Sequence, residues 1–281
     1  MNLLEAILLG IIQGLTEFLP ISSTGHLTVT GKLMGLISAD NPEHWTAFIA
    51  VIQLGTLVSI LIYFRKDILH IIGDFFRDNL SKRKKYSEQS ENSKMGWLII
   101  IGTIPVVIIG LSFKHIIEGE FTKNLYVISC SLILLAVILA VAEKTAKFKK
   151  EMKDITIKDS IIIGIAQSFA LIPGSSRSGT TITGGLFMGL TRETAARFSF
   201  LLSIPAVFAS GLLELYEQLK YLNGDMTVNL VVSTIVSGIF GYLAIDFLLK
   251  YLRKNTTFLF VYYRIAAGVM ILIFLFTQII H

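Results

Sequence analysis

Long apolar runs, separated by short polar segments, make up most of the chain. Six of these runs cover residues 47–64, 96–113, 125–142, 198–216, 228–249 and 258–280. A helix needs about 18 or more mainly apolar residues to cross the hydrocarbon core of a bilayer. Each run reaches that length, so the pattern predicts an all-α polytopic membrane protein with six transmembrane helices.

Two other apolar segments, 3–36 and 161–190, are each interrupted by a polar turn. The turns read "PISSTGH" (20–26) and "PGSSRSGTT" (173–181). A helix that ends before Pro20 would reach about 25 Å, less than the roughly 30 Å hydrocarbon core. Irregular backbone at that depth is tolerated only where protein or a water-filled cavity covers it. We therefore expect two re-entrant helical hairpins whose polar turns meet near the middle of the membrane.

The two interrupted segments belong to an internal repeat. An offset of 154 residues aligns "GIIQ" (10–13) with "GIAQ" (164–167), and it also aligns Ser22 with Ser176. Each half then consists of one hairpin and three spans. Because three is an odd number, the second half must be inverted in the membrane, as in many transporter folds. The two inverted-topology repeats are predicted to cover residues 1–145 and 146–281.

Composition and charge fit a membrane protein and set its orientation. Charged residues make up only 16% of the chain, below the roughly 25% of a typical soluble domain. Nineteen Lys and Arg residues lie in 65–95, 144–159, 191–197 and 250–254, against three in 114–124 and 218–227. Cytoplasmic loops carry such an excess, which predicts that the basic loops are cytoplasmic and that both termini are outside. No nucleic-acid partner is expected, although basic loops also contact anionic membrane lipids.

The first turn brings reactive side chains together. Gln13 and Glu17 are one helical turn apart and face the same way. Ser23 and His26 follow, and His26 is the only one of five histidines inside a predicted hairpin or span. A serine or histidine nucleophile needs an activating neighbour. Ser23 and His26 could fill these two roles in either order, with Glu17 as a second base for Ser23.

Arg177 is the charged residue of the second turn. A charged side chain within the bilayer costs at least about 2.5–3.5 kcal/mol and usually marks a functional site. Either a structural pair with Glu17 or a contact between the planar guanidinium and phosphate oxygens could account for that cost. Turns that open into helices are anion sites, and Glu17 can hold a hard divalent cation. The two turns therefore predict that a phosphate ester or anhydride is bound and cleaved within the bilayer.

The stretches "QGLTEFLPISSTGH" (13–26) and "PGSSRSGTT" (173–181) closely resemble the two signatures of the undecaprenyl pyrophosphate phosphatase family, associated with bacitracin resistance. The resemblance covers essentially the whole chain, including "VIQLGTL" (51–57) and "GGLFMGL" (184–190). It implies hydrolysis of undecaprenyl diphosphate to undecaprenyl phosphate and inorganic phosphate in the bacterial plasma (inner) membrane. That reaction recycles the lipid carrier for peptidoglycan synthesis, and bacitracin resistance would follow indirectly, through depletion of the diphosphate.

The same resemblance implies the roles of individual residues. The implied catalytic residues are Glu17, Ser23, His26 and Arg177. The implied phosphate-binding residues are Ser22, Ser176, Arg177, Ser178 and Thr181. The family also implies a divalent metal, Mg²⁺ or Ca²⁺, at Glu17 with Gln13, and catalysis that faces the outer side of the membrane. Gln13 is the variant form of a position that carries glutamate or glutamine in the family's first signature.

A polyprenyl-phosphate transporter or flippase is the alternative function, because secondary transporters share this architecture of inverted repeats and broken helices. Asp246 and Arg264, two charges within spans, are predicted either to pair with each other or to serve transport. The other lipid phosphatase class has a basic signature that ends in Arg-Pro, which this sequence lacks. Gln53 is predicted to hydrogen-bond the first turn, and Cys130 to lie in the core. A homodimer is compatible with the sequence.

Overall fold

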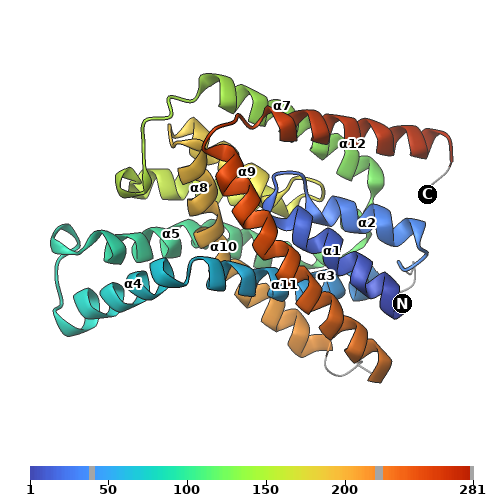
Figure 1. Cartoon of the computed structure of the whole chain (residues 1–281), viewed down its shortest axis with the longest axis horizontal. Coiled ribbons are helices and arrows are strands. Elements are labelled where there is room, and N and C mark those ends of the chain that lie inside the picture. The colour runs from blue at the N-terminus through green and yellow to red at the C-terminus, as the bar shows by residue number, and fades with distance from the viewer. Residues whose placement is uncertain (38–41, 219–223, 279–281) are drawn as a thin grey trace.

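The computed structural model describes residues 1–37, 42–218 and 224–278. Within these residues the regular secondary structure is helical, apart from one isolated bridge between Lys150 and Leu190. In Figure 1, α12 lies beside α7 along one edge of the molecule, and α4 and α5 extend away from the rest at one end. The all-α fold predicted from the apolar runs is confirmed.

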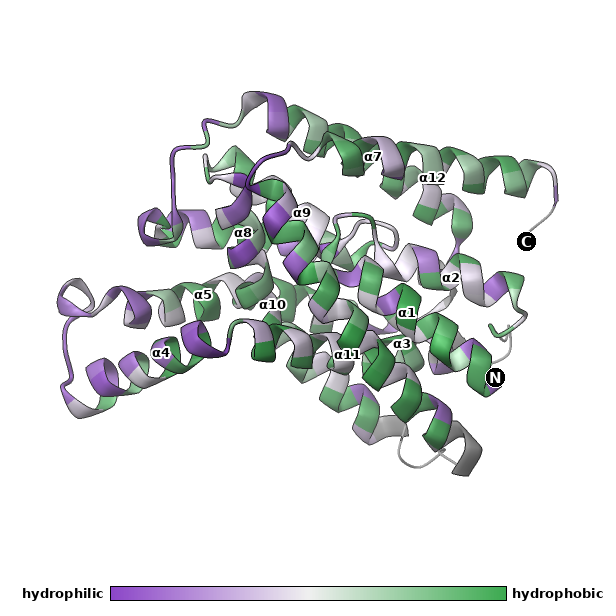
Figure 2. Cartoon of the chain, viewed as in Figure 1, coloured by the Kyte–Doolittle hydropathy of each residue, from purple (hydrophilic) through white to green (hydrophobic). Residues whose placement is uncertain are grey.

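In the described part of the chain, six helices are long and apolar enough to cross a membrane, as predicted, and the chain is a multi-pass membrane protein. These spans are His44–Tyr63, Glu91–Ser112, Leu125–Thr145, Arg192–Tyr216, Thr227–Leu252 and Phe258–Phe276. They lie in α3 (Pro42–Tyr63), α5 (Glu91–Ser112), α7 (Leu125–Thr145), α10 (Arg192–Gln218), α11 (Gly224–Leu252) and α12 (Phe258–Phe276). Figure 2 shows hydrophobic residues along much of α7, α11 and α12.

Two pairs of shorter helices form the hairpins. The first hairpin is α1 (Leu3–Phe18) with α2 (Ser23–Leu33), and the second is α8 (Ile157–Ser168) with α9 (Arg177–Phe187). The second hairpin begins at Ile157, four residues earlier than the predicted start at 161. Thr156 causes the difference: its side chain caps the helix by accepting a hydrogen bond from Asp159 N, and Asp159 bonds back to Thr156 N.

Glycines let the first helix of each hairpin lie against a span. A Cβ on Gly10 would stand 2.6 Å from Ser233 O, so α1 and α11 approach closely at that point. At the position aligned with Gly10, a Cβ on Gly164 would collide with the backbone of Gly102, and here α8 lies against α5. The two hairpins therefore dock on different spans by the same small-residue contact. The inversion of the second half remains a prediction.

The segment after the first span is more ordered than the predicted basic loop. Helix α4 (Arg65–Phe76) begins directly after α3 and lies against the start of α5. Asp78 ties the far end of this hairpin together, because it is buried and accepts from Ser90 N at 2.8 Å and Lys84 Nζ at 3.1 Å. The hydrogen bond from Ser90 N, together with those from Lys84 and Arg77, holds the pKa of Asp78 well below its usual range even though Asp78 is buried.

Shorter helices complete the described chain. They are α6 (Lys114–Glu118), the π-helix η1 (Arg77–Ser81), and the 3₁₀ helices η2 (Tyr86–Glu88), η3 (Glu120–Lys123), η4 (Met152–Asp154) and η5 (Phe169–Leu171). Cys130, predicted to lie in the core, is instead exposed on α7. Cys130 therefore lies on an exposed face of a membrane span.

The basic segments meet at one end of the molecule. Arg197 pairs with Asp67 at 2.8 Å, and Arg253 pairs with Glu193 at 2.8 Å. At the other end of α11, Asn229 donates to Met1 O at 2.7 Å, beside the poorly basic loop 218–227. The spans thus have a basic end and a poorly basic end, the asymmetry on which the predicted orientation rests.

Candidate active site

The two polar turns have nearly the same backbone. Ser22 has φ 75° and ψ 95°, and Ser176 has φ 69° and ψ 112°. A positive φ in a residue other than glycine costs about 1–3 kcal/mol and clusters at functional sites. Glycine would relieve that strain but has no hydroxyl to accept a hydrogen bond from the helix that follows. The Ser22 hydroxyl accepts from Gly25 N at 3.2 Å, and the Ser176 hydroxyl accepts from Gly179 N at 3.1 Å.

Glu17 is the centre of the hydrogen bonds that join the two turns. Its Oε1 accepts from Nη2 of Arg177 at 2.7 Å. Its Oε2 accepts from Ser23 Oγ at 2.6 Å and from Gln13 Nε2 at 3.0 Å. The Glu17–Arg177 pair that the sequence left open is therefore formed, and the Ser23 hydroxyl points at a carboxylate.

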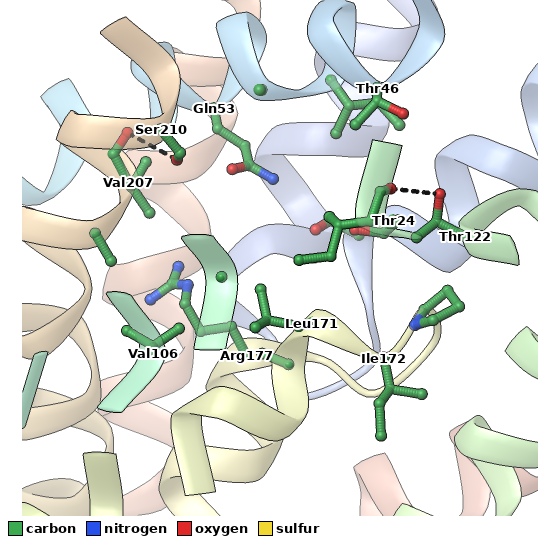
Figure 3. Close-up of a pocket in the computed structure, with 18 of the residues that line it drawn as sticks. Thr24, Thr46, Gln53, Val106, Thr122, Leu171, Ile172, Arg177, Val207 and Ser210 are labelled. Atoms are coloured by element: carbon green, nitrogen blue, oxygen red, sulfur yellow. Dashed lines mark hydrogen bonds between the residues drawn. The ribbon is translucent and has the colours of Figure 1, made fainter. Parts of the chain in front are cut away.

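A cavity of about 400 Å³ lies over the two turns, with walls from α3, α5 and α10. Five of the predicted site residues line it, namely Glu17, Ser22, Ser23, Ser176 and Arg177. Apolar side chains such as Val106 and Val207 form its walls, as the close-up shows (Figure 3). The cavity extends to Lys114 and Lys123 in the loop 114–124, which is poorly basic and lies away from the basic end.

Several polar atoms in and behind this cavity have no hydrogen-bond partner in the described part of the chain. They include Nη1 of Arg177, Oε1 of Gln13, and both amide atoms of Gln167. A buried polar group without a partner costs about 1–3 kcal/mol and calls for an explanation such as a ligand. Arg177 and Gln167 line the cavity, so these unpaired buried atoms lie next to the space in which a polar ligand would bind.

His26 does not face this cavity. Its Nδ1 lies 2.7 Å from Ser22 O, and its Nε2 lies 2.6 Å from the hydroxyl of Tyr263, whose ring stacks on it. Because a carbonyl can only accept, Nδ1 carries the proton and Nε2 accepts from Tyr263. The prediction that His26 activates Ser23 does not fit this geometry, in which Glu17 holds the Ser23 hydroxyl and both His26 nitrogens are occupied.

Ser178 and Thr181 also lie outside the cavity, although they were predicted to bind phosphate. Ser178 Oγ donates to Leu19 O at 3.0 Å and so joins the second turn to the first. Thr181 Oγ1 donates to Arg177 O at 2.7 Å and contacts Ser199 Oγ at 2.5 Å. These hydroxyls bond protein groups and brace the turns. The sequence showed hydroxyls near a turn but not their direction.

Asp246 and Arg264, predicted to pair, do not. Asp246 accepts from Lys250 Nζ at 2.7 Å and from the Tyr63 hydroxyl at 3.3 Å. Arg264 is fully buried and donates to backbone carbonyls, including Pro20 O of the first turn and Ser175 O of the second. Spacing along a sequence could not show that Asp246 lies one turn from Lys250 at a helix end while Arg264 points inward.

Gln53 and Gln167 are two further polar residues that line the cavity. Gln53 reaches into the cavity from α3 (Figure 3), and no hydrogen bond joins its side chain to the first turn in the described residues, contrary to the prediction. Gln167 was not predicted as a site residue. The repeat offset was the signal for it, because that offset places Gln167 where the first half has Gln13.

The residues around Glu17 include candidate ligands for a divalent metal ion. In the described part of the chain, no group of three or more His, Cys, Asp or Glu side chains comes together. Mg²⁺ is usually held by one or two carboxylates together with substrate phosphates and water. The Glu17 carboxylate and the unpaired Gln13 Oε1 fit a divalent cation shared with a phosphate.

Comparison with known proteins identifies the family to which the chain is similar. The family model described as Bacitracin resistance protein BacA matches residues 6–270. A protein of Syntrophobacter fumaroxidans named undecaprenyl-diphosphatase is 56% identical over 268 residues, covering 95% of each chain. Proteins with the same name from Chloroherpeton thalassium and Myxococcus xanthus are 53% and 50% identical and cover 97% and 99% of this chain, and 96% and 90% of their own.

Proposed function

The chain belongs to the family described as Bacitracin resistance protein BacA, and we infer from this membership, and from the names of its relatives, that it is an undecaprenyl-diphosphatase. It is a multi-pass membrane phosphatase that hydrolyses undecaprenyl diphosphate to undecaprenyl phosphate and inorganic phosphate. This product is the lipid carrier, so the enzyme recycles the carrier for peptidoglycan synthesis. Bacitracin resistance follows from depletion of the diphosphate.

One observation supports the location of the chemistry within the fold. Ser23 donates its hydroxyl proton to a Glu17 oxygen, and Arg177, which binds the other Glu17 oxygen, keeps Nη1 free of protein partners beside the same cavity. Ser23 as nucleophile, Glu17 as base and Arg177 as hydrogen-bond donor are thus within reach of one bound phosphoryl group. In the transport alternative no covalent step occurs, and the Ser23–Glu17 contact would have no use.

The proposed reaction has two steps. In the first step Ser23 Oγ attacks the terminal phosphorus, its proton passes to Glu17, and the bond to the bridging oxygen breaks to release undecaprenyl phosphate. Arg177 stabilises the charge on the equatorial oxygens of the transferring group. In the second step water attacks the phosphoserine, Glu17 returns the proton to the departing Ser23 oxygen, and inorganic phosphate leaves.

A divalent cation has a defined place in this proposal. Glu17 and Gln13 would hold it, and its positive charge would neutralise phosphoryl oxygens. We expect Mg²⁺ or Ca²⁺ to raise the thermal unfolding temperature of the purified protein, with no change in Glu17→Gln. An equal rise in that variant would place the cation elsewhere.

The orientation in the membrane is part of the proposal. We place the protein in the bacterial plasma membrane with the basic end in the cytoplasm and both termini outside, so that the cavity opens toward the outer side. Cysteines at Ser81 and at Asn223, which lies outside the described residues, should label from opposite sides of the membrane in a Cys130→Ala background. Labelling of both from the same side would contradict this orientation.

Phosphate release by the purified protein tests the function directly. In detergent there is no membrane to cross, so a phosphatase releases inorganic phosphate from undecaprenyl or farnesyl diphosphate and a transporter does not. We expect release by the wild-type protein and almost none by Ser23→Ala. Absence of release from both substrates, in folded protein with Mg²⁺ or Ca²⁺, would overturn the assignment.

A further inference from the structure

Arg264 is the largest fully buried side chain of the described structure and takes no part in the proposed reaction steps. It lies in the N-terminal half of α12, within a membrane span. Its described hydrogen bonds all go to backbone carbonyls, and no ion pair joins it to a carboxylate in the residues described. A buried charge is normally paired with an acid, so the use of this arginine needs another explanation.

The carbonyls that Arg264 binds belong mostly to the two turns of the site. Nη1 donates to Pro20 O at 3.4 Å in the first turn. Nη2 donates to Gly174 O at 3.3 Å and to Ser175 O at 2.9 Å in the second. The other contacts reach α7: Nε donates to Leu132 O at 3.2 Å, and Nη2 also lies 3.5 Å from Ser131 O. One planar group thus holds both turns against the same helix.

The turns need to be held, because each contains a serine with a positive φ. Ser175 O, the acceptor of the shortest bond from Arg264, belongs to the peptide group directly before the strained Ser176. Gly179 makes room for the guanidinium, since a Cβ there would stand 2.6 Å from Nη1 of Arg264. The second turn therefore contains a glycine that leaves space for Arg264, in addition to Ser176 and Arg177, which line the cavity.

Arg264 also changes the charge of the site. Glu17 and Arg177 pair with each other, so Arg264 adds a positive charge beneath the two turns that is not paired with a carboxylate in the described residues. A fixed positive charge in a low-dielectric region attracts an anionic group without having to reorganise when it binds. A diphosphate is the chemically matched ligand.

We propose that Arg264 is a positioning residue of the phosphatase site, which fixes the two turns relative to each other and supplies a positive charge behind them. The inference rests on the proposed function. Through the turns, Arg264 keeps Ser23 and Arg177 on opposite sides of the same phosphoryl group. Misplacement of reacting groups by about 1 Å can cost about 100-fold in rate.

Substitutions at Arg264 separate its two contributions. Arg264→Lys keeps the charge but cannot reach carbonyls of both turns, so we expect kcat to fall at least about tenfold while KM changes less than about threefold. Arg264→Met loses both contributions, so KM should rise as well. Arg192→Lys, which alters a half-buried arginine paired with the buried Glu143 at the basic end, should keep kcat within about twofold. Size-exclusion profiles and thermal unfolding identify folded variants.

A double-mutant cycle tests the contact when Arg264→Met fails to fold. Gly179→Ala should lower kcat about tenfold in the wild type but less than about threefold further in Arg264→Lys, because the lysine has no atom at the position of Nη1. Gly73→Ala, on α4 with nothing near its Cβ, is the matched glycine control. Additive losses in the cycle, or normal kcat in folded Arg264 variants, would overturn the proposal. Inactive wild-type protein would overturn the proposed function instead.

Discussion

The two turns share a backbone and differ in chemistry. Ser22 and Ser176 occupy the same unusual region of φ and ψ and cap their helices by the same bond. One residue later the first turn has Ser23 and the second has Arg177. Glu17, which binds both, has an apolar Leu171 at its aligned position.

The comparison separates what the duplicated frame supplies from what a few changed side chains supply. The frame supplies two helix N-termini and two caps, which favour anions but break no bond. The changed positions supply a nucleophile and base on one side and a donor on the other. The difference teaches that a pair of anion-binding turns becomes a hydrolytic site when the two copies no longer carry the same residues.

The largest effect is expected at the position where the first turn carries the nucleophile. Ser23→Ala removes the attacking oxygen and should lower kcat at least about 1,000-fold, whereas His26→Gln should lower it less than about tenfold. Phosphate release from farnesyl diphosphate measures both. A rapid quench with labelled substrate should give an adduct that is stable in acid and lost in base. An acid-labile adduct that persists in Ser23→Ala would make His26 the nucleophile and reverse this ranking.

The matching position of the second turn should show a smaller loss. Arg177→Lys keeps the charge but loses the planar fork, and we expect kcat/KM to fall roughly 10–100-fold. Arg197→Lys is the control, since its partner Asp67 lies at the basic end. Near-normal kcat/KM in Arg177→Lys would mean that Arg177 acts only as a counter-ion to Glu17.

A moderate effect is expected where the two copies still carry the same residue. Gln167→Leu removes two unpaired polar atoms from the cavity, and the lost hydrogen bonds to substrate should raise KM about 3–10-fold with little change in kcat. Steady-state kinetics with and without added metal measure this. An unchanged KM would show that the cavity beside Gln167 does not hold the diphosphate.

The smallest effect on turnover is expected far from both turns. Asp78→Asn breaks the buried network of the α4–α5 hairpin, so the thermal unfolding temperature should fall while kcat stays within about twofold. The folded pKa of Asp78 is lowered, so its stabilisation is complete above its ordinary pKa of about 3.9 and is lost as the pH falls below that value. The difference between variant and wild type should therefore be constant from pH 6 to 8 and shrink below about pH 4. A loss of turnover in Asp78→Asn would connect this hairpin to the site.

Periodicity and repeats predicted the elements of this fold well. Apolar runs of sufficient length gave all six spans, and the break at Pro20 gave the first hairpin. The helix α4 was missed because its basic residues dominated the segment, although Ile68, Ile71 and Phe75 recur at helical spacing. Charge alone does not distinguish a loop from a helix that leaves the membrane.

The sequence identified residues of the candidate site but could not show where their side chains point. Glu17, Ser23 and Arg177 meet because each lies at or beside a turn, and turns can be recognised from proline, glycine and serine. His26 and Ser178 also lie beside turns, but rotation along a helix of 3.6 residues per turn carries their side chains behind the cavity. The sequence showed Arg264 as a charge within a span, but its partners are carbonyls, which every residue has, so no pattern of side chains indicated that it binds the two turns.

The aromatic cluster of Phe18, Phe64 and Phe200, beneath the first turn, bears on the proton gradient across the membrane. Phe18 contacts Phe200 edge to face at 5.2 Å, and Phe64, at the basic end of α3, contacts Phe200 in turn. None of these rings lines the cavity. Water must reach the turns to complete hydrolysis, yet a continuous file of water through the protein would conduct protons and discharge the membrane. We expect the cluster to block that path on one side, so that proteoliposomes containing the enzyme keep a pH gradient during turnover and lose it faster in Phe18→Ala.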